Sequence, residues 1–201
     1  MKKLTLADRL LFLATVILAG YLIVVGFKKF AASETALLSV AMGVLLVAAL
    51  LLLLFGFEVL ENKAVVVIAT ITPLSLSTAL VSAYLAQFLL LYSVFALLGF
   101  LIIFYTRYFS SAKSAAMILA PVHGVAGMVI FLLPLLFAFQ GKAPSRFIFV
   151  GAGGALMGIG GLLLAFLKSG KPILSKDVIF RVFPALLFLT TLAFMIGFTG
   201  E

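Results

Sequence analysis

Six long runs without a charged residue constrain this chain more than any other feature of its sequence. They cover Leu10 to Phe27, Thr35 to Phe57, Ala64 to Thr106, Ser114 to Gly141, Phe147 to Leu167 and Val182 to Gly200. A helix needs about 20 apolar residues to cross the hydrocarbon core of a bilayer, and five of the six runs have roughly that length. Charged residues make up 10% of the chain, against about 25% in soluble proteins. The sequence therefore predicts an all-α integral membrane protein.

The third run is too long for a single crossing. Its 43 residues would span the hydrocarbon core twice, because an α-helix rises about 1.5 Å per residue and the core is about 30 Å thick. We expect two helices with a tight connection near Ser82 to Gln87, which makes a bundle of seven transmembrane helices. The alternative is a re-entrant segment broken at Pro73, which leaves six full crossings.

The positions of Lys and Arg favour seven spans, because cytoplasmic loops are enriched in these residues. Seven spans with a cytoplasmic N-terminus place four basic residues outside: Lys28, Lys29, Lys142 and Arg146. The other ten lie inside: Lys2, Lys3, Arg9, Lys63, Arg107, Lys113, Lys168, Lys171, Lys176 and Arg181. Six spans with the same N-terminal side would place six basic residues inside and eight outside. We expect the inner residues to face anionic lipid headgroups, and the chain to reside in a prokaryotic inner (plasma) membrane.

The absence of a long polar linker in the sequence predicts a single domain, residues 1–201. Within it, spans 1–3 and 5–7 show a weak similarity that predicts a 3+1+3 repeat. The third member of each triplet begins with a Lys-x-Val sequence, at Lys63 and Lys176, and continues with a proline, Pro73 or Pro184. Parallel repeats of this kind occur in some transporters.

His123 is the only histidine and lies near the middle of the fifth span. An ionisable residue inside a membrane is a candidate for function, and its imidazole could bind haem or relay protons. Haem ligation by two histidines is excluded by the histidine count, and no cofactor is predicted. The structural alternative is a neutral imidazole, hydrogen-bonded to a backbone carbonyl or to a hydroxyl of the third span, in a colourless protein.

The third span carries the densest polar surface, around Pro73. Its candidate contacts for a solute or cofactor are Thr72, Ser75, Thr78, Ser82 and Gln87, and the seventh span adds Thr190 and Thr191. Residues three and four apart share a helix face, so these groups could line a path for a neutral solute. They could equally bond to neighbouring helices, with an average contribution of about 0.6 kcal/mol each.

The sixth span is rich in glycine. Because no strand precedes it, a nucleotide-binding loop is excluded, and the Gly154-x-x-x-Gly158 spacing indicates a close contact between helices. We expect Gly151, Gly154, Gly158 and Gly161 to serve this packing, within the chain, in a homo-oligomer or against another subunit.

Reactive groups are scarce. The chain has no Cys and one His, and all six of its Asp and Glu residues lie at the ends of spans or in loops. This pattern predicts no metal site, no enzyme activity and no ion coupling of its own, and nothing indicates nucleic-acid binding. Two functions fit: a non-catalytic, membrane-embedded subunit of a larger assembly, or a small carrier or substrate-binding transport subunit for an uncharged or amphipathic solute.

Overall fold

The computed structural model describes residues 3–110 and 112–199, which form helices and connecting turns, with no strand among them. The α-helices are α1 (Leu6–Val25), α2 (Ala32–Phe55), α3 (Lys63–Ala69), α4 (Ile71–Tyr84), α5 (Leu89–Phe109), α6 (Ala112–Phe139), α7 (Ile148–Lys168) and α8 (Lys176–Thr199). Three short 3-10 helices, η1 (Gly56–Glu61), η2 (Ala86–Phe88) and η3 (Ser145–Phe147), extend some of them.

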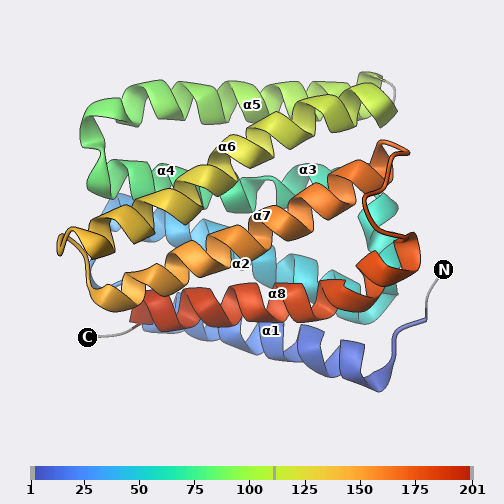
Figure 1. Cartoon of the computed structure of the whole chain (residues 1–201), viewed down its shortest axis with the longest axis horizontal. Helices are drawn as coiled ribbons and strands as arrows, with labels where there is room; N and C mark the ends of the chain where they lie inside the picture. Colours follow the sequence, from blue (N-terminus) through green and yellow to red (C-terminus); the bar gives the residue numbers. More distant parts are fainter. Residues whose placement is uncertain (1–2, 111, 200–201) are drawn as a thin grey trace.

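Seven helical segments in the described part of the chain are long and apolar enough to cross a membrane. The third segment, Lys63–Tyr84, consists of α3 and α4, which lie end to end (Figure 1). The connection expected near Ser82 to Gln87 is present, because α4 ends at Tyr84 and η2 leads into α5. The predicted count of seven span-capable helices is therefore confirmed.

The first helix begins earlier than its charge-free run suggests. Thr5 and Asp8 form a capping box, in which the backbone N–H of Asp8 donates to Oγ1 of Thr5 at 3.2 Å and the N–H of Thr5 donates to Oδ2 of Asp8 at 2.9 Å. This arrangement satisfies two backbone donors at the helix start. Charged Asp8 and Arg9 therefore belong to α1, although the apolar run starts at Leu10.

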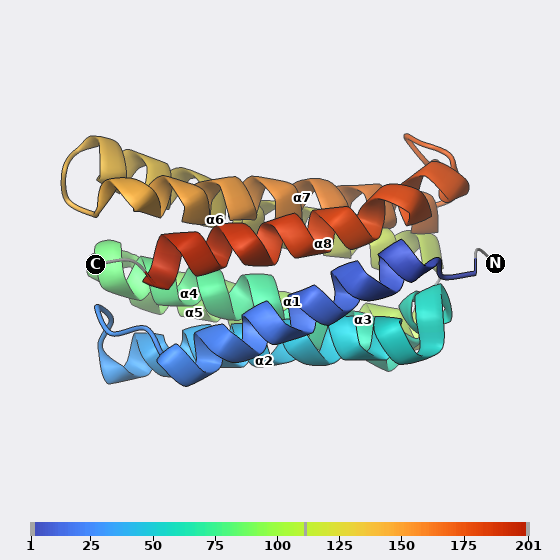
Figure 2. The same ribbon diagram turned by 90° about the horizontal axis from the view of Figure 1, so that it is seen from below.

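Six of the seven segments form a closed ring. Around it, α1 packs on α2, α2 on α4, α4 on α6, α6 on α7, α7 on α8, and α8 back on α1. Helix α5 lies outside this ring against α4 and α6 (Figures 1 and 2). Only 11% of the apolar window of α5 is buried, against 61% for Lys63–Tyr84.

Apolar side chains fill both ends of the ring. One cluster centres on Phe27, Phe147 and Phe198, with the rings of Phe27 and Phe198 edge to face at 5.2 Å. At the other end the rings of Phe57 and Phe180 stack at 4.6 Å. Aromatic pairs at these separations add stability beyond the area that they bury.

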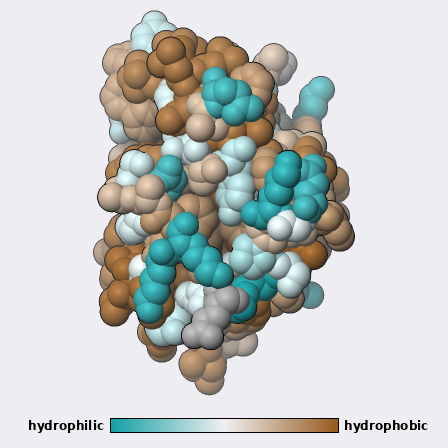
Figure 3. Space-filling model, turned by 90° about the vertical axis from the view of Figure 1, so that its left-hand side faces the viewer, coloured by the Kyte–Doolittle hydropathy of each residue, from teal (hydrophilic) through white to brown (hydrophobic). Residues whose placement is uncertain are grey.

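Basic residues gather at the end of the bundle where α1 begins and α7 ends, on the right in Figure 1. We term this the cation-rich end, and its described basic residues are Lys3, Arg9, Lys63, Arg107, Lys168, Lys171, Lys176 and Arg181. Figure 3 shows the opposite end, where hydrophilic patches are bordered by hydrophobic residues. Between the two ends the flanks expose large apolar side chains, such as Val24 at 86% and Leu90 at 78%.

Glycines bring α7 close to its neighbours. A Cβ on Gly154 would lie 2.8 Å from the carbonyl carbon of Ile130 and 2.9 Å from the backbone nitrogen of Phe131, both on α6. A Cβ on Gly151 would lie 2.8 Å from the carbonyl oxygen of Phe131. The close contact predicted for Gly154 is thus present, because only a residue without a side chain allows this approach.

Gly158 lies opposite Gly127 of α6, where a Cβ on Gly127 would lie 3.8 Å from the Cα of Gly158. A Cβ on Gly158 itself would meet nothing within 4 Å. Helices α6 and α7 leave a second hollow at this point, so the approach is tighter at Gly154 than at Gly158.

Candidate functional site: a cavity inside the helix ring

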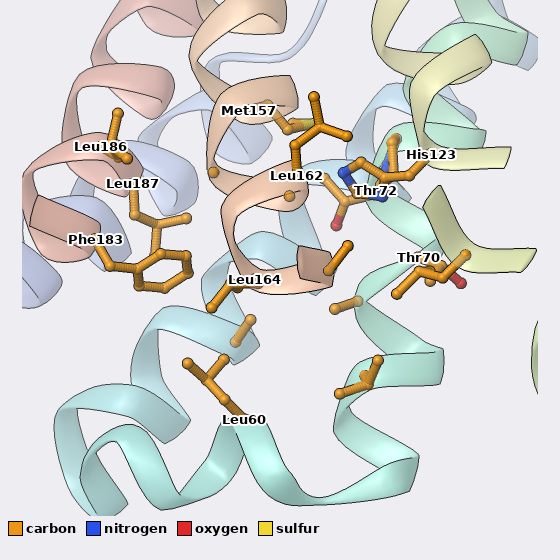
Figure 4. Close-up of a pocket in the computed structure, with 18 of the residues that line it drawn as sticks. Leu60, Thr70, Thr72, His123, Met157, Leu162, Leu164, Phe183, Leu186 and Leu187 are labelled. Carbon is orange, nitrogen blue, oxygen red and sulfur yellow. The ribbon is translucent and has the colours of Figure 1, made fainter. Parts of the chain in front are cut away.

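A largely apolar cavity of about 180 Å³ lies inside the ring. Its wall is built by α2, η1, α3, the start of α4, α6, α7 and α8 (Figure 4). Most of its lining side chains are aliphatic, and they include Leu60, Met157, Leu164, Leu186 and Leu187. Apolar cavities of about 150 Å³ in other proteins stay dry and take up benzene-sized molecules. This cavity is therefore large enough to hold an apolar group.

The break between α3 and α4 shapes one wall. Pro73 has no backbone N–H, so it cannot donate to the carbonyl of Ala69 one turn earlier, and the helix is interrupted at Thr70. Ala69, Thr70, Thr72 and Pro73 all line the cavity. The proline noted in the sequence thus marks the wall of the cavity within a segment, Lys63–Tyr84, that is long and apolar enough to span a membrane.

The hydroxyl groups of two threonines in the wall already form hydrogen bonds with backbone carbonyls. Thr70 donates from Oγ1 to the carbonyl of Val67 at 2.6 Å, and Thr72 donates to the carbonyl of Ala41 at 3.4 Å. Thr190 of α8 also lines the cavity and is 2% exposed. Two of the predicted hydroxyl groups, those of Thr72 and Thr190, therefore reach the site together with His123.

His123 lies between the main cavity and the second hollow, and it lines both. Its ring packs on Gly161, where an added Cβ would lie 2.4 Å from Nε2. Nε2 is buried and has no hydrogen-bond partner among the described residues. The expected hydrogen bond between the imidazole and a backbone carbonyl or a hydroxyl is thus not formed at Nε2 within the described part of the chain, where Gly161 lets the ring pack directly against α7.

The remaining polar residues of the third span serve packing. Ser75 donates to the carbonyl of Leu37 at 2.7 Å, and Ser82 donates to Oε1 of Glu34 at 2.6 Å; both bonds join α4 to α2. Thr78 donates to the carbonyl of Leu74 within α4 at 2.7 Å. The bonds of Ser75 and Ser82 are of the kind that the structural alternative expects, whereas Thr78 bonds within its own helix. None of the three lines the cavity.

Two other predicted residues also lie away from the cavity. Gln87 is exposed in η2, beyond the end of α4. Thr191 is fully buried and donates to the carbonyl of Leu187 at 2.9 Å, so its hydroxyl is satisfied within α8. Neither residue lines the cavity.

Lys168 and Thr70 are the polar residues of the site that sequence reasoning did not single out. Lys168 ends α7, lines the cavity, and donates from Nζ to the carbonyl of Leu60. In the sequence it is one of several lysines around a loop, with nothing to distinguish it from Lys171. Only the packing of α7 against η1 separates their roles.

Groups for redox or hydrolytic chemistry do not converge on this cavity. None of the described lining residues is Asp, Glu or Cys, and the described part of the chain contains no cluster of three metal-ligating side chains. Comparison with known proteins found no matching family model, no matching curated protein and no matching solved structure. A ligand in the cavity would contact mostly apolar side chains, together with a few hydroxyl groups, one imidazole and one ammonium group.

Proposed function

We propose that the chain is a multi-pass membrane protein that binds an apolar or amphipathic solute in the cavity inside its helix ring. Membrane insertion is supported by the seven span-capable helices and by the apolar flanks between two polar ends. Exposed apolar surface on this scale is costly in water and is matched by lipid. The positions of the basic residues support a cytoplasmic cation-rich end.

The observation that carries the binding proposal is the cavity itself. Ligand sites are concave and mostly apolar, with a few polar groups that orient the ligand, and this cavity has that composition. We propose a carrier or substrate-binding transport subunit that lacks ion coupling and catalysis of its own. Support for this comes from the lining, which contains no carboxylate of the kind that proton- or sodium-coupled carriers use.

Gly160 offers a direct test. It is buried, lines the cavity, and has nothing within 4 Å of an added Cβ. Gly160→Leu should fill the cavity without displacing another helix. Gly158→Leu is the matched control, because its side chain would enter the second hollow, between α6 and α7.

The experiment uses the purified full chain and a photoreactive long-chain alcohol, followed by mass spectrometry of the labelled peptides. We expect label on the cavity-facing residues of α7 and α8, competed by excess unlabelled alcohol, in the wild type and in Gly158→Leu. Gly160→Leu should lose this competed label. Labelling that is unaffected by Gly160→Leu would show that the cavity is not the binding site.

A second candidate function rests on α5. This helix lies outside the ring with a mostly exposed apolar surface, which fits a non-catalytic subunit that packs against a partner in the membrane. Gentle solubilisation followed by native mass spectrometry distinguishes the two. Stable co-purifying chains, or a homo-oligomer, would favour the subunit, and a single chain would favour the carrier.

A further inference from the structure

Among the described residues that line the cavity, Lys168 is the only charged one. It lies at the cation-rich end, where its Nζ donates to the neutral carbonyl of Leu60. A carbonyl satisfies one of the three donors of an ammonium group and leaves its charge uncompensated. A partly buried charge in that state favours an anion nearby.

Arg107 places a second cation near the first. It belongs to the last turn of α5, and its positive charge acts on Lys168 across the cation-rich end. Its Nε is buried and has no hydrogen-bond partner among the described residues. The guanidinium therefore has a donor without a partner among the described residues at the cation-rich end.

Glu61 does not neutralise both cations. The charge of Glu61 also acts on Lys168, but Oε1 of Glu61 lies 3.7 Å from Nζ of Lys176, with which it forms an ion pair. This carboxylate is therefore shared between Lys168 and Lys176. Positive charge remains in excess where the cavity reaches this end.

The cavity extends away from these cations along one face of α7. The lining residues Met157, Gly161, Leu164 and Lys168 follow helical spacing along α7. Eleven residues of helix separate Met157 from Lys168, which corresponds to about 16 Å at the usual helical rise. Elongated apolar walls with cations at one end match a molecule that has a hydrocarbon chain and a charged head.

We propose that the cavity binds a single-chain amphiphile with an anionic oxygen headgroup, a carboxylate or a phosphate, whose chain lies against α7 and α8 and whose headgroup meets Lys168 and Arg107. This assignment rests on the proposed function of the cavity and adds the charge and the orientation of the ligand. The headgroup would lie at the cation-rich end, and the chain would extend towards Thr190 and His123.

The test measures saturable binding of radiolabelled palmitate to the full chain in a neutral detergent, with hexadecanol as the uncharged probe of equal chain length. Lysophosphatidic acid, a phosphate amphiphile, serves as the second anion. Lys168→Gln and Arg107→Gln remove the proposed headgroup contacts. The exposed loop residue Lys171 supplies the control Lys171→Gln, which removes the same charge outside the cavity.

We expect at least one of the two anions to bind about tenfold or more tightly than the alcohol, since hydrogen bonds to charged groups are the stronger class. Lys168→Gln should remove most of that difference, and Lys171→Gln should preserve it. If both anions and the alcohol bind equally to the wild type, the anion assignment is overturned. This comparison needs no variant. If Gly160→Leu still abolishes that binding, the cavity function survives; if no probe binds saturably, both proposals fail.

Discussion

The imidazole of His123 occupies the space that a side chain would need at Gly161: a Cβ added to this glycine would lie 2.4 Å from Nε2 and 2.6 Å from Cδ2. Two features of the sequence that lie 38 positions apart, the only histidine and one member of the glycine-rich run, are therefore one structural unit. The glycine permits the ring to pack against α7, and the ring forms part of the cavity wall.

Gly161→Ala should therefore displace the imidazole. Overpacking a filled site costs about 1–3 kcal/mol, whereas Gly→Ala in a helix by itself gains about 0.5–1 kcal/mol. Gly160→Ala is the control, because its Cβ would enter open space in the same cavity. We expect Gly161→Ala to be less stable than Gly160→Ala in reversible unfolding by SDS followed by circular dichroism. The reverse order would contradict the packing of His123 on Gly161.

His123→Leu should leave stability unchanged or raise it by about 1 kcal/mol, since a buried polar atom without a partner is costly. The same unfolding assay measures this effect, and His123→Asn, which keeps a polar group there, should not stabilise. We also expect the purified wild type to show no Soret band. A Soret band that His123→Leu abolishes would establish haem binding and would make electron transfer the leading function.

The spans were predictable because membrane solubility is a property of each segment taken alone. A run without charge must be long enough to cross the bilayer, and the tight turn before η2 follows from dividing the 43-residue run. The cavity was not predictable in this way. It depends on which helices become neighbours in the ring, and hydropathy carries little information about neighbours.

Single residues also show that a sequence pattern does not predict which helix a side chain contacts. Gly154 and Gly158 form one motif, but only Gly154 abuts the backbone of α6. The polar residues of the third span share one helical face, yet Thr72 lines the cavity while Ser82 bonds to Glu34 on α2. Each difference follows from the crossing of two helices, where the distance between their axes changes along their length.

Gly154→Leu should disrupt folding, and Gly158→Leu should be tolerated. A side chain at Gly154 would collide with the backbone of Ile130 and Phe131, which cannot move without separating α6 from α7. The yield of monodisperse protein after size-exclusion chromatography measures the outcome. Equal yields for the two variants would mean that the α6–α7 contact is less close than described.

Ser82→Ala should destabilise the chain by about 1.5–3 kcal/mol, because hydrogen bonds to charged groups contribute more than neutral ones. Its hydroxyl donates to Oε1 of Glu34 at 2.6 Å, between α4 and α2, and Glu34 is 8% exposed. Thr106→Ala is the control, since its hydroxyl bonds only within α5, to the carbonyl of Ile102 at 2.8 Å. An equal effect of both substitutions on SDS unfolding would show that the Glu34 contact adds nothing.

The orientation of the chain can be tested with two reporter fusions. If the cation-rich end is cytoplasmic, Gly170, between α7 and α8, lies in the cytoplasm. At Gly170, a reporter that works only in the cytoplasm should therefore be active, and one that works only outside should be silent. After Glu201 the result should be reversed, with activity only from the reporter that works outside, because one further span separates the two sites. The physical reason is that Lys and Arg near span ends are retained on the cytoplasmic side, and eight described basic residues lie at the cation-rich end against four at the other. Cytoplasmic signals from both fusions would mean that α8 does not cross the membrane, and exchanged signals would mean that the bundle is inverted and the proposed anion headgroup faces outward.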